Sequence, residues 1–145
     1  MPNYAAEGYK AAGGKMSVGI SPASSKVEHV LKYRLPIEAY DTILYTGLHY
    51  VGRDALLIQS SDAVVSIGGR LGTLHEFTIA METDTPIGFL QGGGGISEEI
   101  QAILHAAGQA RDDTAVVFSA DADELVASLT RILDQEHRKY HAIYS

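Results

Sequence analysis

The stretch SDAVVSIGGRLGTLHE, residues 61–76, combines a short apolar run, a glycine-rich turn and a helix-like pattern. The apolar run 63–67 is long enough for a buried strand, and the helical pattern begins at Thr73. A strand that passes through glycines into a helix places unpaired backbone N–H groups at the positive end of the helix dipole. This arrangement predicts a site for phosphate or another anion, with the Glu76 carboxylate one helical turn inside.

Short apolar segments alternate with helical patterns along the rest of the chain. We expect strands at residues 16–20, 42–45, 63–67, 87–90 and 115–119. We expect helices at residues 4–12, 51–60, 73–81, 97–107 and 121–136, a loop with at most a short helix at 23–36, and a tail at 137–145. This alternation predicts an α/β fold with a parallel sheet of about five strands and helices on both faces.

The turns at residues 46–47, 68–72 and 92–95 each follow an expected strand. Ligands of open parallel sheets bind beyond the carboxyl ends of the strands, so we expect these turns to line one crevice. The chain begins with a helical pattern, whereas a fold of this type normally begins with a strand. We therefore expect the first strand and its glycine turn to have no counterpart here.

Composition limits the classes of function. A chain of 145 residues, 46% hydrophobic and 20% charged, predicts a single globular domain over residues 1–145. The net charge of −7 argues against binding to nucleic acid, which favours a basic face. There is no cysteine, no apolar run of membrane-spanning length and no secretory leader, so we expect a cytoplasmic protein whose partner is a small molecule.

Two interpretations fit Thr73-x-x-Glu76. The first is a capping box, in which the Thr73 hydroxyl accepts from the N–H of Glu76 and the carboxylate reaches back. The second makes Glu76 a carboxylate that faces the ligand, either as a base or as the partner of a ribose hydroxyl.

Arg53 and Arg70 are the candidate anion-binding side chains. Each could be a solvated surface arginine, which is the usual environment of a lone arginine. Alternatively, Arg53 could reach a phosphate or a leaving group, and Arg70, inside the glycine turn, could clamp a phosphate. His49 and Tyr50, just before Arg53, are candidates for stacking against a ring. The six histidines show no metal-binding spacing, and we expect neither a metal nor a cofactor.

The stretch 68–76, GGRLGTLHE, resembles the P-G-G-x-G-T-x-x-E motif of the LOG-like family, Rossmann-type proteins long labelled "possible lysine decarboxylase". The resemblance extends to AAEGYKAAGGKMSVGISP at 5–22, GRD at 52–54 and PIGFL at 86–90, and covers roughly residues 5–133. Gly68 replaces the proline of the motif, Arg70 replaces its second glycine, and the first strand of the family has no match. Nothing in the sequence supports lysine decarboxylation.

The resemblance implies a phosphoribohydrolase, which cleaves the N-glycosidic bond of a nucleoside 5′-monophosphate into base and ribose 5-phosphate. It implies that Arg53 and Glu76 are catalytic. It implies a phosphate-binding turn formed by Gly68, Gly69, Arg70, Gly72 and Thr73.

Two other hypotheses remain. One is a non-catalytic module that binds or carries a nucleotide or the molybdenum cofactor, as some relatives do. The other is a protein that works only as a homodimer or higher homo-oligomer, because loss of the first strand would expose a sheet edge for a partner to cover.

Overall fold

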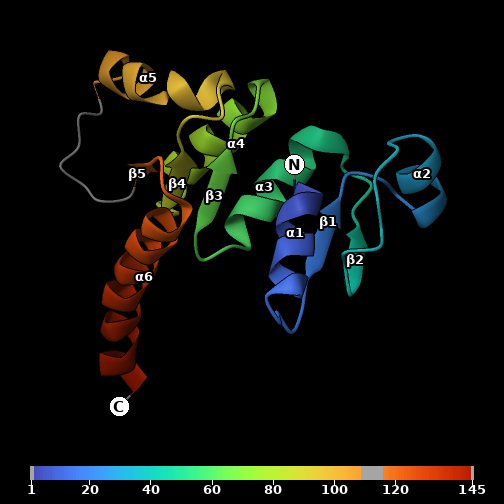
Figure 1. Cartoon of the computed structure of the whole chain (residues 1–145), viewed down its shortest axis with the longest axis horizontal. Coiled ribbons are helices and arrows are strands. Elements are labelled where there is room, and N and C mark those ends of the chain that lie inside the picture. The colour runs from blue at the N-terminus through green and yellow to red at the C-terminus, as the bar shows by residue number, and fades with distance from the viewer. Residues whose placement is uncertain (1, 109–115, 145) are drawn as a thin grey trace. The chain divides into compact units, whose positions relative to one another are not determined.

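The computed structural model describes residues 2–108 and 116–144 (Figure 1). The chain forms two compact units, residues 1–57 and 58–145. The elements of the first unit are α1 (Pro2–Ala11), β1 (Val18–Ser21), α2 (Lys26–Leu31), β2 (Thr42–Tyr45) and most of α3 (His49–Gln59). The second unit contains β3 (Val64–Ile67), α4 (Leu71–Glu82), β4 (Ile87–Leu90), the 3-10 helix η1 (Gly95–Glu98), α5 (Ile100–Ala106), β5 (Val116–Ser119) and α6 (Ala122–Tyr144).

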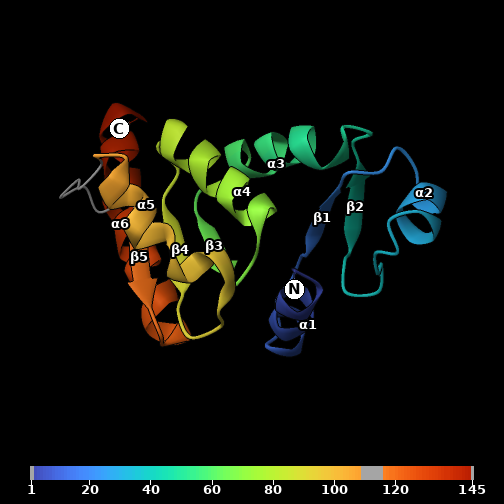
Figure 2. The same ribbon diagram turned by 90° about the horizontal axis from the view of Figure 1, so that it is seen from above.

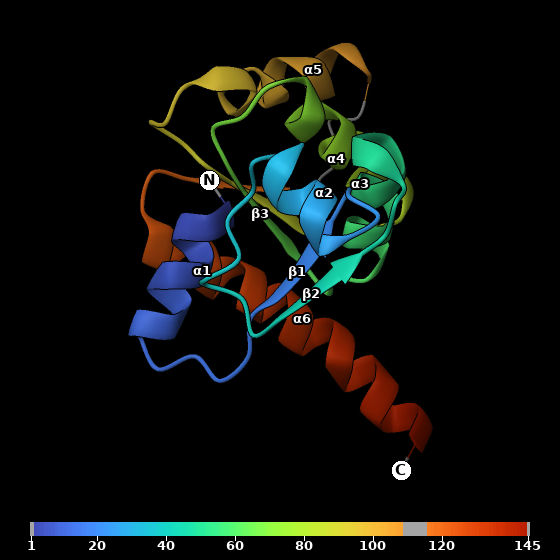
Figure 3. The ribbon, with the colours of Figure 1, turned by 90° about the vertical axis from the view of Figure 1, so that its right-hand side faces the viewer.

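All strand pairings in the described residues are parallel, as predicted. In the first unit β1 pairs with β2, with Val18 opposite Thr42, and Figure 3 shows the two strands side by side. In the second unit the strand order is β3-β4-β5, with β4 between its two neighbours (Figure 2). Consecutive parallel strands need a crossover connection, and helices lie between the strands along the chain. The α/β fold class is confirmed.

Helices cover both faces of the sheet in the second unit. On one face, Phe89 of β4 packs against Phe77 of α4, with ring centroids 5.8 Å apart, and shares a buried core with Ile100 of α5. On the other face, Gly88 lies against Leu125 and Leu129 of α6, which are almost fully buried. Figure 2 shows α6 beside β4 and β5. Alternation of side chains along β4 therefore lets a four-residue strand contact two layers of helix.

The first unit is held together by polar contacts as well as by its sheet. Lys10 of α1 forms an ion pair with Asp41 at 2.7 Å, and the same carboxylate accepts the N–H of Ser17 at 2.7 Å. The hydrogen bond from Lys10, followed by that from the Ser17 N–H, lowers the pKa of Asp41. These bonds join α1 to the segments that enter β1 and β2.

The loops after β1 and β2 are bonded to each other. The carbonyl oxygen of Ser21 accepts both the N–H and the hydroxyl of Thr46, and the carbonyl oxygen of Ala23 accepts the N–H of Gly47. Behind this pair of loops, His29 is buried, with its Nδ1 2.8 Å from the Ser21 hydroxyl. The backbone of both loops is therefore fixed at the carboxyl end of the first sheet.

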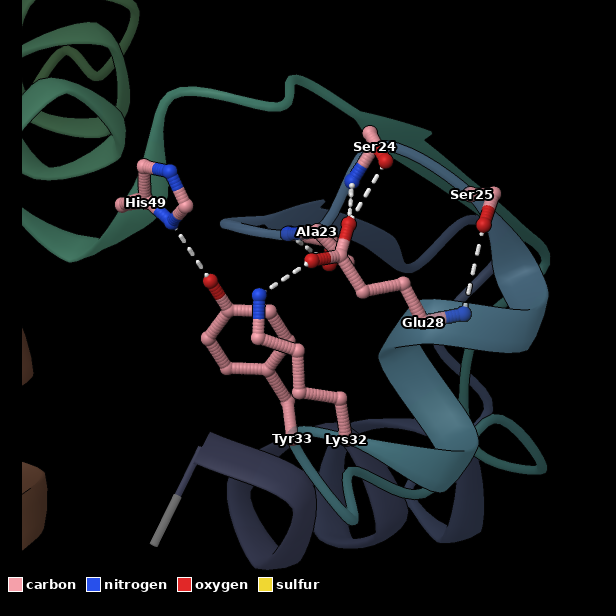
Figure 4. A network of polar contacts seen from close by, with 8 residues as sticks. Ala23, Ser24, Ser25, Glu28, Lys32, Tyr33 and His49 are labelled. Carbon is pink, nitrogen blue, oxygen red and sulfur yellow. Dashed lines mark hydrogen bonds and ion pairs between the residues drawn. The ribbon is translucent and has the colours of Figure 1, made fainter.

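A network of side chains on α2 faces the loop after β1 (Figure 4). The Glu28 carboxylate accepts the hydroxyl and N–H of Ser24 and the Lys32 ammonium at 2.6–2.7 Å. The hydrogen bonds from Lys32 and then from Ser24 lower the pKa of Glu28 from its ordinary 4.5 to about 2. The Ser25 hydroxyl caps α2 by accepting the N–H of Glu28.

Several predicted element boundaries were wrong, among them the starts of α1, at Pro2 rather than residue 4, and of α3, at His49 rather than residue 51. Helix α4 begins at Leu71 rather than Thr73, and its N-cap is Arg70, because the turn after β3 is only three residues long. The helix expected from residue 97 is a 3-10 turn followed by α5, since residues 95–98 pack against the turn after β3. Strand β1 begins at Val18 instead of residue 16, because Ser17 bonds to Asp41.

Helix α6 also differs from the prediction, because it continues to Tyr144, through most of the segment expected to be a tail. The segment 122–144 contains neither proline nor glycine, so no residue in it forces an end to the helix. The predicted start of the last strand at residue 115 lies outside the described residues, as does residue 145. Within the described part of the chain, no helix has the length and apolarity that crossing a membrane would require.

Gly88→Ala tests the packing of α6 on the sheet. An added Cβ would stand 2.9 Å from a methyl carbon of Leu125 and of Leu129, so these buried side chains would have to move. We expect a loss of about 1–3 kcal/mol in the free energy of unfolding, measured by urea titration. The control is Gly8→Ala, which lies in open space in α1 and should gain about 0.5–1 kcal/mol. Equal stability of Gly88→Ala and wild type would contradict the packing.

The pKa of Glu28 tests the α2 network. Because this pKa is lowered in the folded protein, the network stabilises the fold above the ordinary pKa of 4.5, and that contribution is lost as the pH falls through about 2. We expect Lys32→Met to raise the pKa of Glu28 toward its ordinary value, as measured by carboxyl-carbon NMR titration. The matched control, Lys26→Met on the same helix, should leave it near 2. A Glu28 that titrates near 4.5 in wild type would show that the network does not form in solution.

Candidate functional site

The turn between β3 and α4 has the backbone that an anion site needs. Gly68 and Gly69 adopt positive φ angles of 64° and 101°, a region that favours glycine. The turn delivers the chain directly into α4, a helix of 12 residues. Arg70, the N-cap residue, makes no side-chain cap hydrogen bond, so its side chain does not satisfy the first N–H groups of the helix.

Thr73 is not the N-cap residue of α4. It is the third residue of the helix, so the capping box expected for Thr73 and Glu76 is not present. The Thr73 side chain instead lies against Gly69, where an added Cβ would overlap its hydroxyl. The close approach of Thr73 is therefore a second reason for glycine at position 69.

The second glycine turn, residues 92–95, packs directly against the first. The carbonyl oxygen of Gly69 accepts the N–H of Ile96 at 3.1 Å. The carbonyl oxygen of Gly68 accepts the hydroxyl of Ser97, which is fully buried. A Cβ on Gly95 would come too close to the Gly69 carbonyl oxygen. These contacts confirm that the two turns of the second unit lie together, and they identify Ser97 as a residue that no sequence motif indicated.

The remaining residues of the predicted phosphate turn lie at its surface. Arg70 and Gly72 are exposed, whereas Thr73 and Glu76 are half-buried. Glu76 lies in the second turn of α4, and it has an interaction partner. The first turn of α4 and the exposed Gly69 therefore form an accessible, positively polarised surface, and Glu76 follows in the next turn of the helix.

Arg53 is not the solvated arginine that one interpretation expected. Its side chain is only 17% exposed, and its Nε lies 3.1 Å from the carboxylate of Asp54. This Nε is buried and forms no hydrogen bond among the described residues, so the contact is an ion pair without hydrogen-bond geometry. The guanidinium also lies over the ring of Tyr50, 5.7 Å from its centroid. Arg53 belongs to the first unit and Glu76 to the second.

His49 and Tyr50 begin α3 beside Arg53. The Nδ1 of His49 lies 2.8 Å from the hydroxyl of Tyr33, and the rings of Tyr33 and Tyr50 meet edge to face at 5.5 Å. Tyr33 could not be found from sequence patterns, because it lies far from residues 49–53 in the chain and carries no motif. Among the described residues, no group of acidic or histidine side chains could hold a metal ion.

Two solved structures are similar to this chain. TM1055, a solved structure, is 26% identical, with a TM-score of 0.66 over 90% of this chain and 69% of that chain. The molybdenum cofactor binding protein of the phototrophic bacterium Rippkaea orientalis is 23% identical, with a TM-score of 0.71 over 90% and 70%. Both likenesses confirm the Rossmann-like fold. No curated protein matches the chain.

The family assignment comes from the sequence itself. Residues 1–126 match the model of the SLOG cluster4 family, which covers the predicted phosphate turn, Arg53 and Glu76. This match confirms the resemblance to LOG-like proteins that the motif indicated. The protein belongs to the SLOG cluster4 family.

Proposed function

We propose that this protein binds the phosphate of a nucleotide at the turn formed by Gly68, Gly69, Arg70, Gly72 and Thr73. One observation carries the proposal: the start of α4 lacks a side-chain cap and is framed by two glycine turns that hold each other in place. Backbone N–H groups at such a helix end attract phosphate through hydrogen bonding and the helix dipole. The similar Rippkaea orientalis protein binds the molybdenum cofactor, which is consistent with a small ligand here.

We further propose that the bound ligand is a nucleoside 5′-monophosphate and that its N-glycosidic bond is hydrolysed. Water adds to the anomeric carbon of the ribose, and the base departs with the electron pair of the broken bond and takes up a proton. An oxocarbenium-like sugar develops positive charge, which the Glu76 carboxylate can stabilise while it accepts a proton from the water. Arg53 would bind an anionic group of the substrate or stabilise the leaving base.

The alternative is a module that binds or carries a nucleotide or a related cofactor without turnover. The state of Arg53 favours this alternative, because its guanidinium already has a carboxylate neighbour, Asp54, and a ring neighbour, Tyr50. An arginine held in this way has less freedom to follow a departing base.

We also propose that the protein assembles into a homo-oligomer. Light scattering, which measures the molar mass in solution, would test this.

Hydrolysis is tested by release of free base from a panel of nucleoside 5′-monophosphates, followed by liquid chromatography. We expect Glu76→Gln to lower the rate about 10²-fold or more, because the carboxylate charge is lost. The matched control is Glu82→Gln, which changes an exposed glutamate at the other end of α4 and should leave the rate unchanged. If a nucleotide raises the melting temperature of the wild type but no free base is released, the non-catalytic alternative holds instead.

Phosphate binding is tested through the contact between the two glycine turns. We expect Gly95→Ala to weaken binding of ribose 5-phosphate at least ~10-fold in calorimetry, since the added methyl group displaces Gly69, and each factor of ten is about 1.4 kcal/mol. Gly94→Ala is the matched control. It also has a positive φ, 70°, and so carries a similar backbone strain, but its Cβ would meet open space.

Equal binding by wild type and Gly95→Ala would remove the glycine turns from the proposed site. Comparable weakening in both variants would mean that loop strain, rather than the position of Gly69, determines affinity.

A further inference from the structure

The sheet of the second unit has an open edge at β3. Among the described residues β3 pairs with β4 alone, and β5 lies on the far side of β4 (Figure 2). The N–H of Val64 donates to the carbonyl oxygen of Pro86, so the backbone polar groups of Val64 point toward β4. These groups alternate in direction along a strand, so the N–H and carbonyl groups of Val65 and Ile67 point to the open edge.

The same two residues expose apolar side chains. Val65 is 47% exposed and Ile67 is 40% exposed. In the parallel register Val65 stands opposite Gly88, which faces α6, but α6 packs mainly on β4 and β5. At the other edge of this sheet, no residue of β5 is exposed. The uncovered part of the sheet is therefore the edge of β3 and the surface beside it on the α6 side.

The sequence of β3 does nothing to block this edge. Natural edge strands are usually protected by a lysine, a proline or a bulge, because an open edge accepts another strand. Residues 64–67, VVSI, contain no charged residue and no proline, and all four pair with β4 in an unbroken register. Such an edge fits an extended segment that offers backbone hydrogen bonds and apolar side chains. A second copy of β3 offers both.

We propose that two copies of this protein associate by antiparallel pairing of β3 with β3 across a two-fold axis at Ser66. The pairing joins two three-stranded sheets into one continuous sheet. The inference rests on the homo-oligomer proposed above and deepens it by naming the strand and its register. It does not depend on the binding of a phosphate or a nucleotide.

The register uses every polar group at the open edge. Val65 of each copy stands opposite Ile67 of the other, as a hydrogen-bonded pair that engages the N–H and the carbonyl of both residues. The exposed side chains of these residues meet on the α6 side of the joined sheet. The register also brings Asp62, which precedes β3, to the end of the second strand, where Arg70 follows. Both of these charged residues are exposed, so opposite charges flank the apolar centre on each side.

Amide hydrogen exchange, followed by NMR at increasing protein concentration, tests the pairing directly. We expect the N–H groups of Val65 and Ile67 to become protected as the concentration rises, because they face the open edge in the monomer and are bonded in the dimer. The N–H of Ser66 points to β4 and should be protected at every concentration, so it serves as the internal reference. Exchange at Val65 and Ile67 that does not depend on concentration would overturn the inference.

Sedimentation equilibrium of variants tests the interface. We expect Val65→Lys to raise the Kd of the dimer about 10-fold or more, because it places ammonium groups in the apolar centre. The matched control is Val27→Lys, which changes a 66% exposed valine of α2 and should associate as the wild type does. Circular dichroism identifies a variant that loses its fold, and Ile67→Lys replaces Val65→Lys in that case.

A charge exchange tests the register. Asp62→Arg sets like charges together at two places in the dimer, and we expect it to raise the Kd about 5-fold. Adding Arg70→Asp to the same chain restores opposite charges and should restore association. A double variant that associates no more tightly than Asp62→Arg would overturn the register at Ser66.

The remaining outcomes separate this inference from the proposals on which it borders. A wild type that stays monomeric at every concentration overturns both the pairing and the homo-oligomer. A dimer that Val65→Lys does not weaken overturns the pairing alone. Ribose 5-phosphate binding is measured on the wild-type samples, and its absence in a protein that forms the dimer would count against the phosphate site and not against the pairing.

Discussion

The contact between the two glycine turns is the constraint on which the proposed phosphate site depends. The carbonyl oxygens of Gly68 and Gly69 are both occupied, by the Ser97 hydroxyl and the Ile96 N–H. A glycine-rich turn would otherwise sample many conformations, because glycine loses more backbone entropy on ordering than any other residue. These two bonds from η1, which follows the second glycine turn, offset part of that cost and hold the first turn in one shape. The start of α4 therefore needs no rearrangement before its backbone N–H groups can bind a phosphate.

The same principle operates in the first unit through different chemistry. There the loops after β1 and β2 are joined by backbone bonds from Thr46 and Gly47, and the Glu28 network fixes α2 against the first of these loops. Each unit thus stabilises its strand-end loops by bonding one loop to the next. Parallel sheets place such loops at one edge, so neighbouring loops can restrain each other and leave side chains available for a ligand.

Sequence patterns predicted the elements better than their ends. Strands β2 and β4 were predicted with their observed boundaries, because residues 42–45 and 87–90 are apolar runs flanked by proline, glycine or charged residues. The predicted start of α4 was wrong, because Thr73 has the residue type of an N-cap but stands at the third helical position. The sequence places a good capping residue near a helix, and only the number of residues in the turn determines whether it caps.

For the candidate site, too, the sequence predicted local features but not contacts between distant residues. The motif at residues 68–76 could be identified from the sequence alone, since its glycines, threonine and glutamate stand at a fixed spacing over nine residues. Sequence patterns did not predict the contacts of Ser97 and Tyr33, because their partners lie 29 and 16 residues away.

The sequence by itself determined the α/β alternation, the glycine turn that leads into a helix, and the family, because each depends on residues close together in the chain. Only the tertiary structure decided which glycine turn supports which, and whether an arginine or a tyrosine is buried or exposed. The ion pair that holds Arg53 and the partnership of Tyr33 with His49 belong to this second group. Those properties depend on contacts between distant segments, and such contacts form only when strands pair and helices pack.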